Sequence, residues 1–298
     1  MNDTERQLLL DVIARLDRQE RTLAELRRLV GPSGIPFPDG TLLVQSIHGI
    51  KYFIDPTDLV MAPQLVVYRQ WEHDVSAFVL NALNENSVFM DVGANFGYVS
   101  CLAGATIGNR GAGCVIAVEP NPKMVKLLKR NIQVNWSMAS IEVHECAAGA
   151  APGYVTLIVP EGHAANASVS TTNVTRDGTN CIIVTADTVD GIAAGRRLDV
   201  LKIDVEGHEA AVLRGATETI GRSAGITVLM EWSLSQMKSA GFSPADLLSQ
   251  VRALGLTPFE LVGTPSDPRL KIGQIGPEIA ADELAKRAYG NIVLRRSK

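Results

Sequence analysis

Apolar runs typical of buried strands alternate with amphipathic helical patterns through the central part of the chain. Beyond the apolar run that leads to Asp91, strand-like segments lie at residues 114–118, 141–145, 198–203 and 226–230. The helical patterns between them include Pro122–Val134 and Glu209–Thr219. This order predicts an α/β fold with a doubly wound, mostly parallel sheet, because parallel strands need long crossover connections, which are usually helices.

Two regions precede this alternation, and one segment interrupts it. Residues 41–55 predict two short strands around Ser46–Gly49, and Val75–Leu83 predicts a helix. The segment 153–183 is polar and rich in Asn, Thr and Ser, with apolar runs near both ends, and it predicts a hairpin or flap. The expected organisation is an N-terminal helix at 1–31 and a domain at 40–298, with an extension at 40–87 and a core at 88–298 that contains the 153–183 insert.

The N-terminal segment has a heptad pattern. Apolar or neutral side chains at alternating three- and four-residue spacing form one helical stripe: Leu9, Val12, Leu16, Gln19, Leu23, Leu26 and Val30. Residues 31–34, Gly-Pro-Ser-Gly, end the pattern. One interpretation is a short coiled coil that pairs two subunits in a homodimer. The other is an amphipathic helix that docks on its own domain.

Composition narrows the class of protein. The 298 residues are 46% hydrophobic and 20% charged, with a net charge of −4, so a globular fold is expected and nucleic acid is a disfavoured partner. The four cysteines, Cys101, Cys114, Cys146 and Cys181, lie far apart and predict buried thiols in a reducing cytosol. The N-terminus lacks the features of a secretory signal, and no apolar run reaches about 18 residues. A cytoplasmic protein without a membrane span is the expectation.

The stretch "VFMDVGANFGYVS", residues 88–100, contains the first candidate site. Its D-x-G-x-N-x-G spacing lacks the G-x-G-x-x-G of dinucleotide folds, and Glu119 ends the next strand, where it could bind ribose hydroxyls. Asp91 would attract a ligand with an ammonium group and a positive sulfur. S-adenosylmethionine meets these demands, but other nucleotides stay open. The structural alternative is that Asp91 caps the turn and Asn95 adopts a left-handed conformation.

A second group of ionisable residues lies in "LDVLKIDVEGHEAAVLRGA", residues 198–216. His208 is the predicted general base, because its ordinary pKa is about 6.5 and it begins a helix near the cofactor edge, and Asp204 or Glu206 could orient it. The alternative is that His208 and Glu209 only form the polar first turn of a helix. A divalent cation held by Asp204 and Glu231 is a weaker alternative, so no metal is expected.

These motifs, with "VIAVEPNP", "CAAG" and "YGNIVLRR", resemble the FkbM family of S-adenosylmethionine-dependent methyltransferases. The resemblance implies a class I, Rossmann-like methyltransferase fold with a seven-stranded sheet, and O-methylation of a hydroxyl on a sugar, a polyketide or a glycosylated natural product. By position, it implies a cofactor site with a glycine loop, a ribose-binding acid, adenine-flanking alanines and the "KIDVEGxE" element: Asp91, Gly93, Ala94, Asn95, Gly97, Glu119, Asn121, Ala147, Ala148, Asp204, Glu206, Gly207 and Glu209. Trp71 and Glu72 resemble a pair that lines the cofactor pocket, with core packing as the alternative for Trp71.

Two other functions compete with methyl transfer to a small-molecule hydroxyl. A nucleotide-dependent oxidoreductase or epimerase would need a phosphate-binding turn, which Gly93–Gly97 does not match. A non-catalytic assembly protein that kept the fold would show no turnover of the donor. The segments expected to shape the acceptor site, 153–183 among them, contain no readable code for the acceptor.

Overall fold

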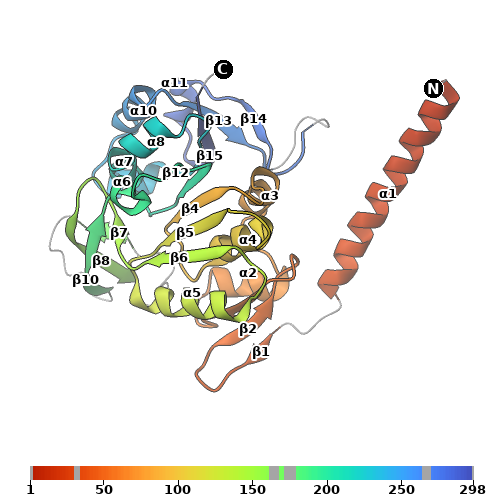
Figure 1. Cartoon of the computed structure of the whole chain (residues 1–298), viewed down its shortest axis with the longest axis horizontal. Coiled ribbons are helices and arrows are strands. Elements are labelled where there is room, and N and C mark those ends of the chain that lie inside the picture. Colours follow the sequence, from red (N-terminus) through yellow and green to blue (C-terminus); the bar gives the residue numbers. More distant parts are fainter. Residues whose placement is uncertain (1–2, 30–33, 161–167, 171–178, 264–269, 297–298) are drawn as a thin grey trace.

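A central twisted sheet with helices on both faces forms the body of the protein (Figure 1). The computed structural model describes residues 3–29, 34–160, 168–170, 179–263 and 270–296. Alternate residues of the strands face opposite layers, as expected for a side-chain period of two. Phe89 packs in one apolar cluster with residues of α3 (His73–Ala82) and α4 (Tyr98–Ile107), whereas Met90 packs in the other with residues of α7 (Glu209–Arg214) and α10 (Pro244–Ala253).

The sheet has eight strands in the order β14-β13-β15-β12-β11-β4-β5-β6. Their bounds are β4 (Val88–Val92), β5 (Cys114–Val118), β6 (Ser140–His144), β11 (Val200–Ile203), β12 (Thr227–Ser233), β13 (Thr257–Leu261), β14 (Ile275–Glu278) and β15 (Tyr289–Arg295). The run from β12 to β6 is parallel, while β15 is antiparallel to both of its neighbours. The mostly parallel sheet is confirmed, but the expected seven strands are eight, because β14 returns antiparallel along the edge of β13.

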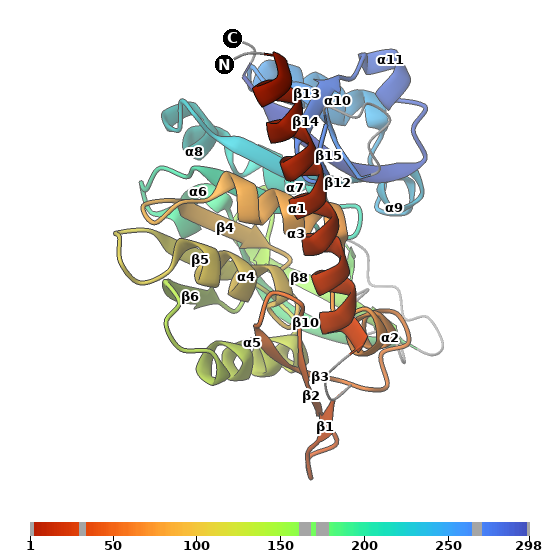
Figure 2. The same cartoon turned by 90° about the vertical axis from the view of Figure 1, so that its right-hand side faces the viewer.

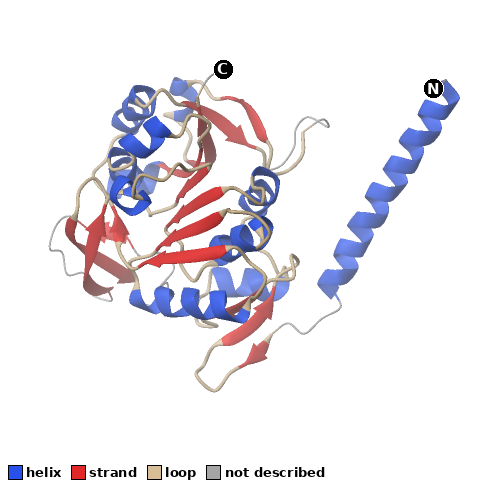
Figure 3. Ribbon diagram, viewed as in Figure 1, coloured by secondary structure: helices blue, strands red, loops and turns tan. Residues whose placement is uncertain are grey.

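The remaining helices are short apart from α1 and α5 (Figure 3). The helices are α1 (Asp3–Leu29), α2 (Met61–Val67), α5 (Pro122–Val134), α6 (Val189–Ala193), α8 (Thr217–Arg222), α9 (Leu234–Ser239) and α11 (Ala281–Leu284). The single helix predicted at Glu209–Thr219 is in fact α7 and α8. The chain turns at Gly215, where a Cβ atom would lie 2.1 Å from the carbonyl oxygen of Gly149, and Asp190 then accepts the Thr219 N–H at 2.7 Å in the first turn of α8.

The predicted hairpin in the insert is confirmed. Strand β8 (Gly153–Pro160) pairs antiparallel with β10 (Thr179–Asp187), and β9 (Ser168–Ser170) and β7 (Ala147–Ala148) complete a second sheet in the order β7-β10-β8-β9. Residues 161–167 and 171–178 of the predicted insert lie outside the described part of the chain. Cys181 on β10 is exposed, so the expectation of buried thiols is wrong for this residue, although Cys101 is buried.

The N-terminal extension forms a third sheet from β1 (Ile35–Pro36), β2 (Leu42–Gln45) and β3 (Lys51–Ile54), at the opposite end of the molecule from α11 (Figure 2). Two asparagines of α5 bind the backbone of β3. The Asn131 amide accepts the Phe53 N–H at 2.6 Å and donates to the carbonyls of Phe53 and Phe96 at 3.1 and 2.8 Å. Asn135 makes the equivalent pair of bonds with Lys51. These side chains satisfy edge groups that would otherwise be buried without partners.

Helix α1 lies apart from the body (Figures 1 and 3). Residues 5–23 are all exposed, and the apolar stripe is no exception: Leu9, Leu16 and Leu23 are 49%, 54% and 56% exposed. The alternative that this helix docks on its own domain is therefore wrong. Among the described residues, no helix combines the length and apolarity needed to cross a membrane.

The contacts of Asn131 lead to a prediction about stability. The substitution Asn131→Ala would leave the buried N–H of Phe53 and two carbonyls without their partner. Since one unsatisfied buried group costs about 1–3 kcal/mol, we expect a loss of about 3 kcal/mol in the free energy of unfolding by urea denaturation. Asn109→Ala, at an exposed position, is the control and should change it by less than about 0.5 kcal/mol. Equal stability of the two variants would contradict this role of Asn131.

Candidate active site

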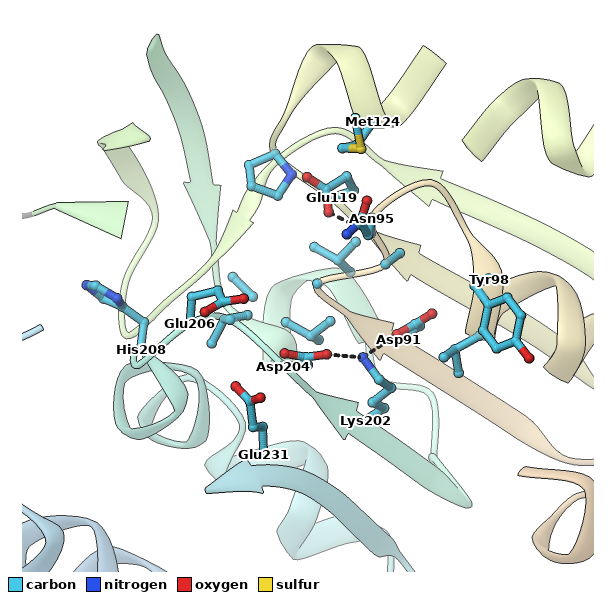
Figure 4. A pocket seen from close by; sticks show the side chains of 18 of the residues that line it. Asp91, Asn95, Tyr98, Glu119, Met124, Lys202, Asp204, Glu206, His208 and Glu231 are labelled. Carbon is cyan, nitrogen blue, oxygen red and sulfur yellow. Dashed lines mark hydrogen bonds and ion pairs between the residues drawn. The ribbon is translucent and has the colours of Figure 1, made fainter. Parts of the chain in front are cut away.

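A cavity of about 260 Å³ opens at the carboxyl ends of the parallel strands. This edge is where open α/β sheets bind their ligands. Its walls come from the turn after β4 and from the ends of β5, β11 and β12 (Figure 4). The N-terminal extension adds Met61, Trp71 and Glu72, and the insert adds Leu157 and Val169. Two of the three segments expected to shape the acceptor site, 153–183 and the region before Val88, thus contribute to the same cavity as the glycine turn, whereas no described residue of the third, 259–280, lines it.

The glycine turn after β4 adopts left-handed backbone conformations at three positions. The φ angles of Gly93, Asn95 and Gly97 are 82°, 53° and 89°, so the left-handed conformation suggested for Asn95 is present. A Cβ atom on Gly93 would lie 1.8 Å from the backbone oxygen of Asp204, and one on Gly97 would lie 2.4 Å from the Leu128 side chain. Packing against β11 and α5 therefore already requires glycine at both positions, before any ligand is considered.

Glu119 stands at the end of β5, across the cavity from the β11 and β12 tips (Figure 4). Its two oxygens accept the backbone N–H groups of Asn95 and Asn121 at 2.7 and 2.8 Å. Burial raises the pKa of Glu119 to about 7, against the lowering effect of these two hydrogen bonds. Asn121 caps α5 by accepting the Lys123 N–H. The structure thus fixes Glu119 in the wall and leaves the remaining lone pairs of its carboxylate able to bind hydroxyls.

Asp91 forms the floor of the cavity and is fully buried. Ser100 Oγ donates to its Oδ2 at 2.6 Å, and Lys202 Nζ lies 3.5 Å from its Oδ1. The same ammonium group donates to Asp204 Oδ2 at 3.0 Å. Burial by itself would lower the pKa of Lys202, but the charges of Asp204, Asp91 and Glu72 raise it above its ordinary value. Lys202 is therefore a permanent cation that joins the two aspartates predicted from separate motifs.

Carboxylates gather around the tips of β11 and β12 (Figure 4). Burial, followed by the charge of Glu231, raises the pKa of Glu206 to about 8, and burial, followed by the charge of Asp204, does the same for Glu72. Glu206 accepts a hydrogen bond from Gln236 Nε2. The backbone of both glutamates is in the left-handed region, with φ angles of 41° for Glu72 and 55° for Glu206, which residues other than glycine rarely adopt. Such strain is common at functional sites.

Glu231, at the end of β12, is 8% exposed and lines the cavity. Tyr289 and Gln236 lie within hydrogen-bonding reach of its carboxyl group, but its Oε2 is buried without a partner. Burial and the charge of Asp204 raise the pKa of Glu231 to about 7. Tyr289 begins the motif "YGNIVLRR", but no sequence pattern assigns it a role in the site, and Gln236 lies outside every recognised motif.

The predicted base His208 lies at the left of the cavity in Figure 4, with its ring directed away from Asp204 and Lys202. The ring packs edge-on against Phe242, and both of its nitrogens are buried without partners. Burial lowers the pKa of His208. The expectation that Asp204 or Glu206 orients it is wrong, because they bond to Lys202 and Gln236 instead.

The other predicted residues are placed as follows. Glu209 accepts the Gly207 N–H at 3.1 Å and closes the turn before α7, so its contact is structural. Ala94, Ala147 and Ala148 lie in the cavity wall. For the weaker alternative of a cation on Asp204 and Glu231, the described residues contain no group of three or more His, Cys, Asp or Glu able to hold a metal ion.

The sequence of the chain matches a known protein family and a characterised relative. The sequence profile of the Methyltransferase FkbM domain matches residues 91–256, more than half of the chain, and the protein therefore belongs to the FkbM methyltransferase family. A hexuronic acid methyltransferase of Haloferax volcanii, AglP, is 30% identical over 162 residues, which are 50% of this chain and 58% of that relative.

Solved methyltransferase structures align with this chain at low sequence identity. A SAM-dependent O-methyltransferase from Thermotoga maritima aligns with a TM-score of 0.42 and 14% identity, over 86% of this chain and 78% of that one. A precorrin-6y C5,15-methyltransferase from Geobacter metallireducens aligns with a TM-score of 0.39 and 14% identity, over 75% and 89%.

The raised pKa of Glu206 predicts how the stability of the ligand-free protein depends on pH. A carboxyl with a higher pKa when folded adds stability below its unfolded pKa, near 4.5, and this stability is lost as the pH rises through about 8. Glu206→Gln removes this titration. We expect the stability of the variant relative to wild type to increase by about 2 kcal/mol between pH 5 and pH 8.5, since one pKa unit is worth about 1.4 kcal/mol and partial exposure weakens the effect.

Thermal unfolding at the two pH values measures this difference. Glu218→Gln, exposed on α8, is the control and should follow wild type at both. A stability difference between Glu206→Gln and wild type that stays constant with pH would show that Glu206 does not titrate abnormally.

Proposed function

We propose that the protein is an S-adenosylmethionine-dependent O-methyltransferase that acts on a hydroxyl of a small molecule, a sugar or a polyketide or glycosylated natural product. The observation that carries this proposal is the charge of the cavity. Six carboxylates and one lysine line it among the described residues: Glu72, Asp91, Glu119, Asp204, Glu206, Glu231 and Lys202. Such a lining favours a cationic ligand without phosphate groups and disfavours a dinucleotide.

The residues present fit the parts of this donor. Glu119 lines the cavity and would accept hydrogen bonds from ribose hydroxyls, and Met124, Ala147 and Ala148 would supply apolar surface for a purine ring. The carboxylates around β11 and β12 suit the ammonium and sulfonium groups. When bound, S-adenosylmethionine supplies an activated methyl group on a positively charged sulfur.

The chain's own contribution to transfer would be alignment, exclusion of water and removal of a proton. The acceptor oxygen, methyl carbon and sulfur must lie in line, which the walls from the extension and the insert would enforce. Leu157 and Val169 supply apolar surface on the insert side of the cavity. A sugar acceptor is supported by the relative whose name describes a hexuronic acid methyltransferase.

Donor binding tests the first half of the proposal. We expect isothermal calorimetry to detect binding of S-adenosylmethionine and none of NAD. Glu119→Gln should weaken donor binding roughly 10–100-fold, because a hydrogen bond to a charged group is worth about 1.5–3 kcal/mol. Wild-type affinity should also fall below about pH 7, where Glu119 gains a proton, and this fall should be smaller in the variant.

Glu218→Gln is the control and should bind the donor like wild type. A screen for methyl transfer to hydroxylated glycosides and polyketides then tests the second half. Tight binding of NAD, or donor binding without transfer to any hydroxyl acceptor, would argue against the proposed function.

A further inference from the structure

We propose that Glu231 binds the acceptor hydroxyl through its unpartnered Oε2 and removes the hydroxyl proton during methyl transfer. This inference rests on the proposed function and adds the residue that acts on the acceptor. Glu231 is nine-tenths buried, yet Oε2 has no hydrogen-bond partner in the protein and the side chain points into the cavity (Figure 4). A buried acceptor without a partner is costly, and a ligand hydroxyl would satisfy it.

The surroundings of Glu231 hold the carboxyl group and leave Oε2 for a ligand. Tyr289 of β15 and Gln236 of α9 lie within hydrogen-bonding reach of it. Lys202 and Asp204 face it from β11, and Glu72, Glu206 and Glu209 add further negative charge. The other acids at the strand tips already have protein partners, since Asp204 binds Lys202 and Glu206 binds Gln236. Asp91 Oδ1 also lacks a hydrogen-bond partner, but it lies 3.5 Å from the Lys202 ammonium group, so Glu231 Oε2 is the oxygen left for the acceptor.

The proposed step balances in atoms and charge. Glu231 takes the proton from the acceptor hydroxyl while the oxygen forms its bond to the methyl carbon. The bond between that carbon and sulfur breaks, its electrons stay on sulfur, and the sulfonium becomes a neutral thioether. The reaction leaves a methyl ether and a protonated Glu231, which returns its proton to water. Burial sets the pKa of Glu231 near 7, within the range that suits a general base at neutral pH.

The carboxylates around Glu231 also select the charge of the acceptor. The bound donor cation favours the ionised forms of Glu72, Glu206 and Glu231, so an acceptor carboxylate close to them would then meet like charge at short range in a partly dry site. A neutral hydroxyl compound avoids this repulsion, and an amino group gains attraction. We therefore infer an acceptor that is neutral or cationic near the reacting hydroxyl, which would set this chain apart from a methyltransferase of hexuronic acids.

The substitution Glu231→Gln tests the base on the acceptor that wild type methylates fastest. We expect kcat at saturating donor to fall at least 100-fold, while loss of one carboxylate beside the donor raises the donor dissociation constant by less than tenfold. At saturating donor, wild-type kcat should decline as the pH falls through the pKa of Glu231 in the donor complex, which the bound cation lowers from about 7, and the residual activity of the variant should lack this decline. Glu231→Asp, which keeps a carboxylate, should recover part of the rate, and Glu218→Gln should match wild type.

The outcomes separate this inference from the proposed function. A Glu231→Gln protein that folds, binds donor and turns over within threefold of wild type would overturn the role of Glu231 and leave the methyltransferase proposal standing. Wild type that binds donor but methylates no hydroxyl would overturn both. For acceptor charge, a hexoside, its amino analogue and its uronic acid form one matched series. The uronic acid should have at least tenfold lower kcat/KM than the other two, and a preference for it would refute the charge argument.

A second inference comes from α1 and is independent of the cavity. We infer that the exposed stripe of α1 binds α1 of a second copy of this chain in a parallel coiled coil. Leu9, Val12, Leu16, Gln19 and Leu23 occupy the a and d positions of successive heptads, and the four apolar members are 46–56% exposed. Apolar surface of this regularity on an isolated helix needs a partner with the same spacing, which a second copy supplies.

The charges beside the stripe specify the parallel orientation. Arg15 occupies a g position and Glu20 the following e position, so a parallel partner places opposite charges side by side twice across the pair. Leu8 and Ile13, the preceding g and e residues, extend the apolar contact in the same alignment. In an antiparallel pair g would face g and e would face e, so Arg15 would meet no acid, because no g position among residues 5–23 carries one.

Light scattering on the full chain, with variants in α1, tests this interface. Wild type should have the mass of a dimer, and Leu16→Glu should have that of a monomer. Leu10→Glu, an equally exposed leucine on the opposite face, should remain dimeric. Arg15→Glu and Glu20→Arg should each weaken the dimer, and the double variant should restore it. A monomeric wild type, or dissociation by Leu10→Glu as readily as by Leu16→Glu, would overturn the inference.

Discussion

A lysine between two aspartates joins the tips of the two central strands of the sheet. The parallel register places Lys202 of β11 directly beside Asp91 of β4, and Asp204 lies two residues further on the same face of the chain. All three side chains line the cavity. Removing one charge from such a buried group leaves the others uncompensated, at a cost of about 3–5 kcal/mol. The backbone of Asp204 also donates its N–H to the Val92 carbonyl at 3.0 Å and closely approaches Gly93, so this salt bridge and the glycine turn share the same two strand tips.

The same contact explains why the remaining carboxylates of the cavity lack a counter-charge. Lys202 is committed to Asp91 and Asp204, and the cavity lining among the described residues contains no other lysine or arginine. Glu72, Glu206 and Glu231 are therefore left with raised pKa values, caused first by burial and then by one another and Asp204. The site stores electrostatic free energy that a cationic ligand releases, which is the physical basis of the proposed donor.

Strand tips and turn conformations could be predicted from the sequence, because each depends on a short local pattern. Asp91, Glu119, Asp204 and Glu231 were all placed at strand ends in this way, and the structure brings them around one cavity. What could not be predicted depends on register or on distant elements. The partnership of Asp91 with Lys202 follows from the pairing of β4 with β11, and the partners of Glu231 come from α9 and β15.

Some features have two compatible explanations, which the sequence alone does not separate. Gly93 and Gly97 are compatible with a ligand close to the backbone, but the carbonyl of Asp204 and the side chain of Leu128 already exclude a Cβ atom there. The break between α7 and α8 was missed for a similar reason, since the close approach of Gly215 to Gly149 joins segments far apart in the sequence. The eighth strand, β14, depends on an edge that only the assembled sheet provides.

The stored charge also couples the two substrates of the proposed reaction. A cation bound beside Glu231 favours the ionised form of its carboxyl group, so binding of the donor would lower the pKa of Glu231 from its value near 7. Linkage then requires that protons leave the site as the donor enters. Donor binding would therefore increase the ionised fraction of Glu231, which is the form that a general base requires, while the methyl group is in place. The excess of carboxyl groups raises their pKa values in the ligand-free cavity, and the bound donor would supply the positive charge that stabilises their ionised forms.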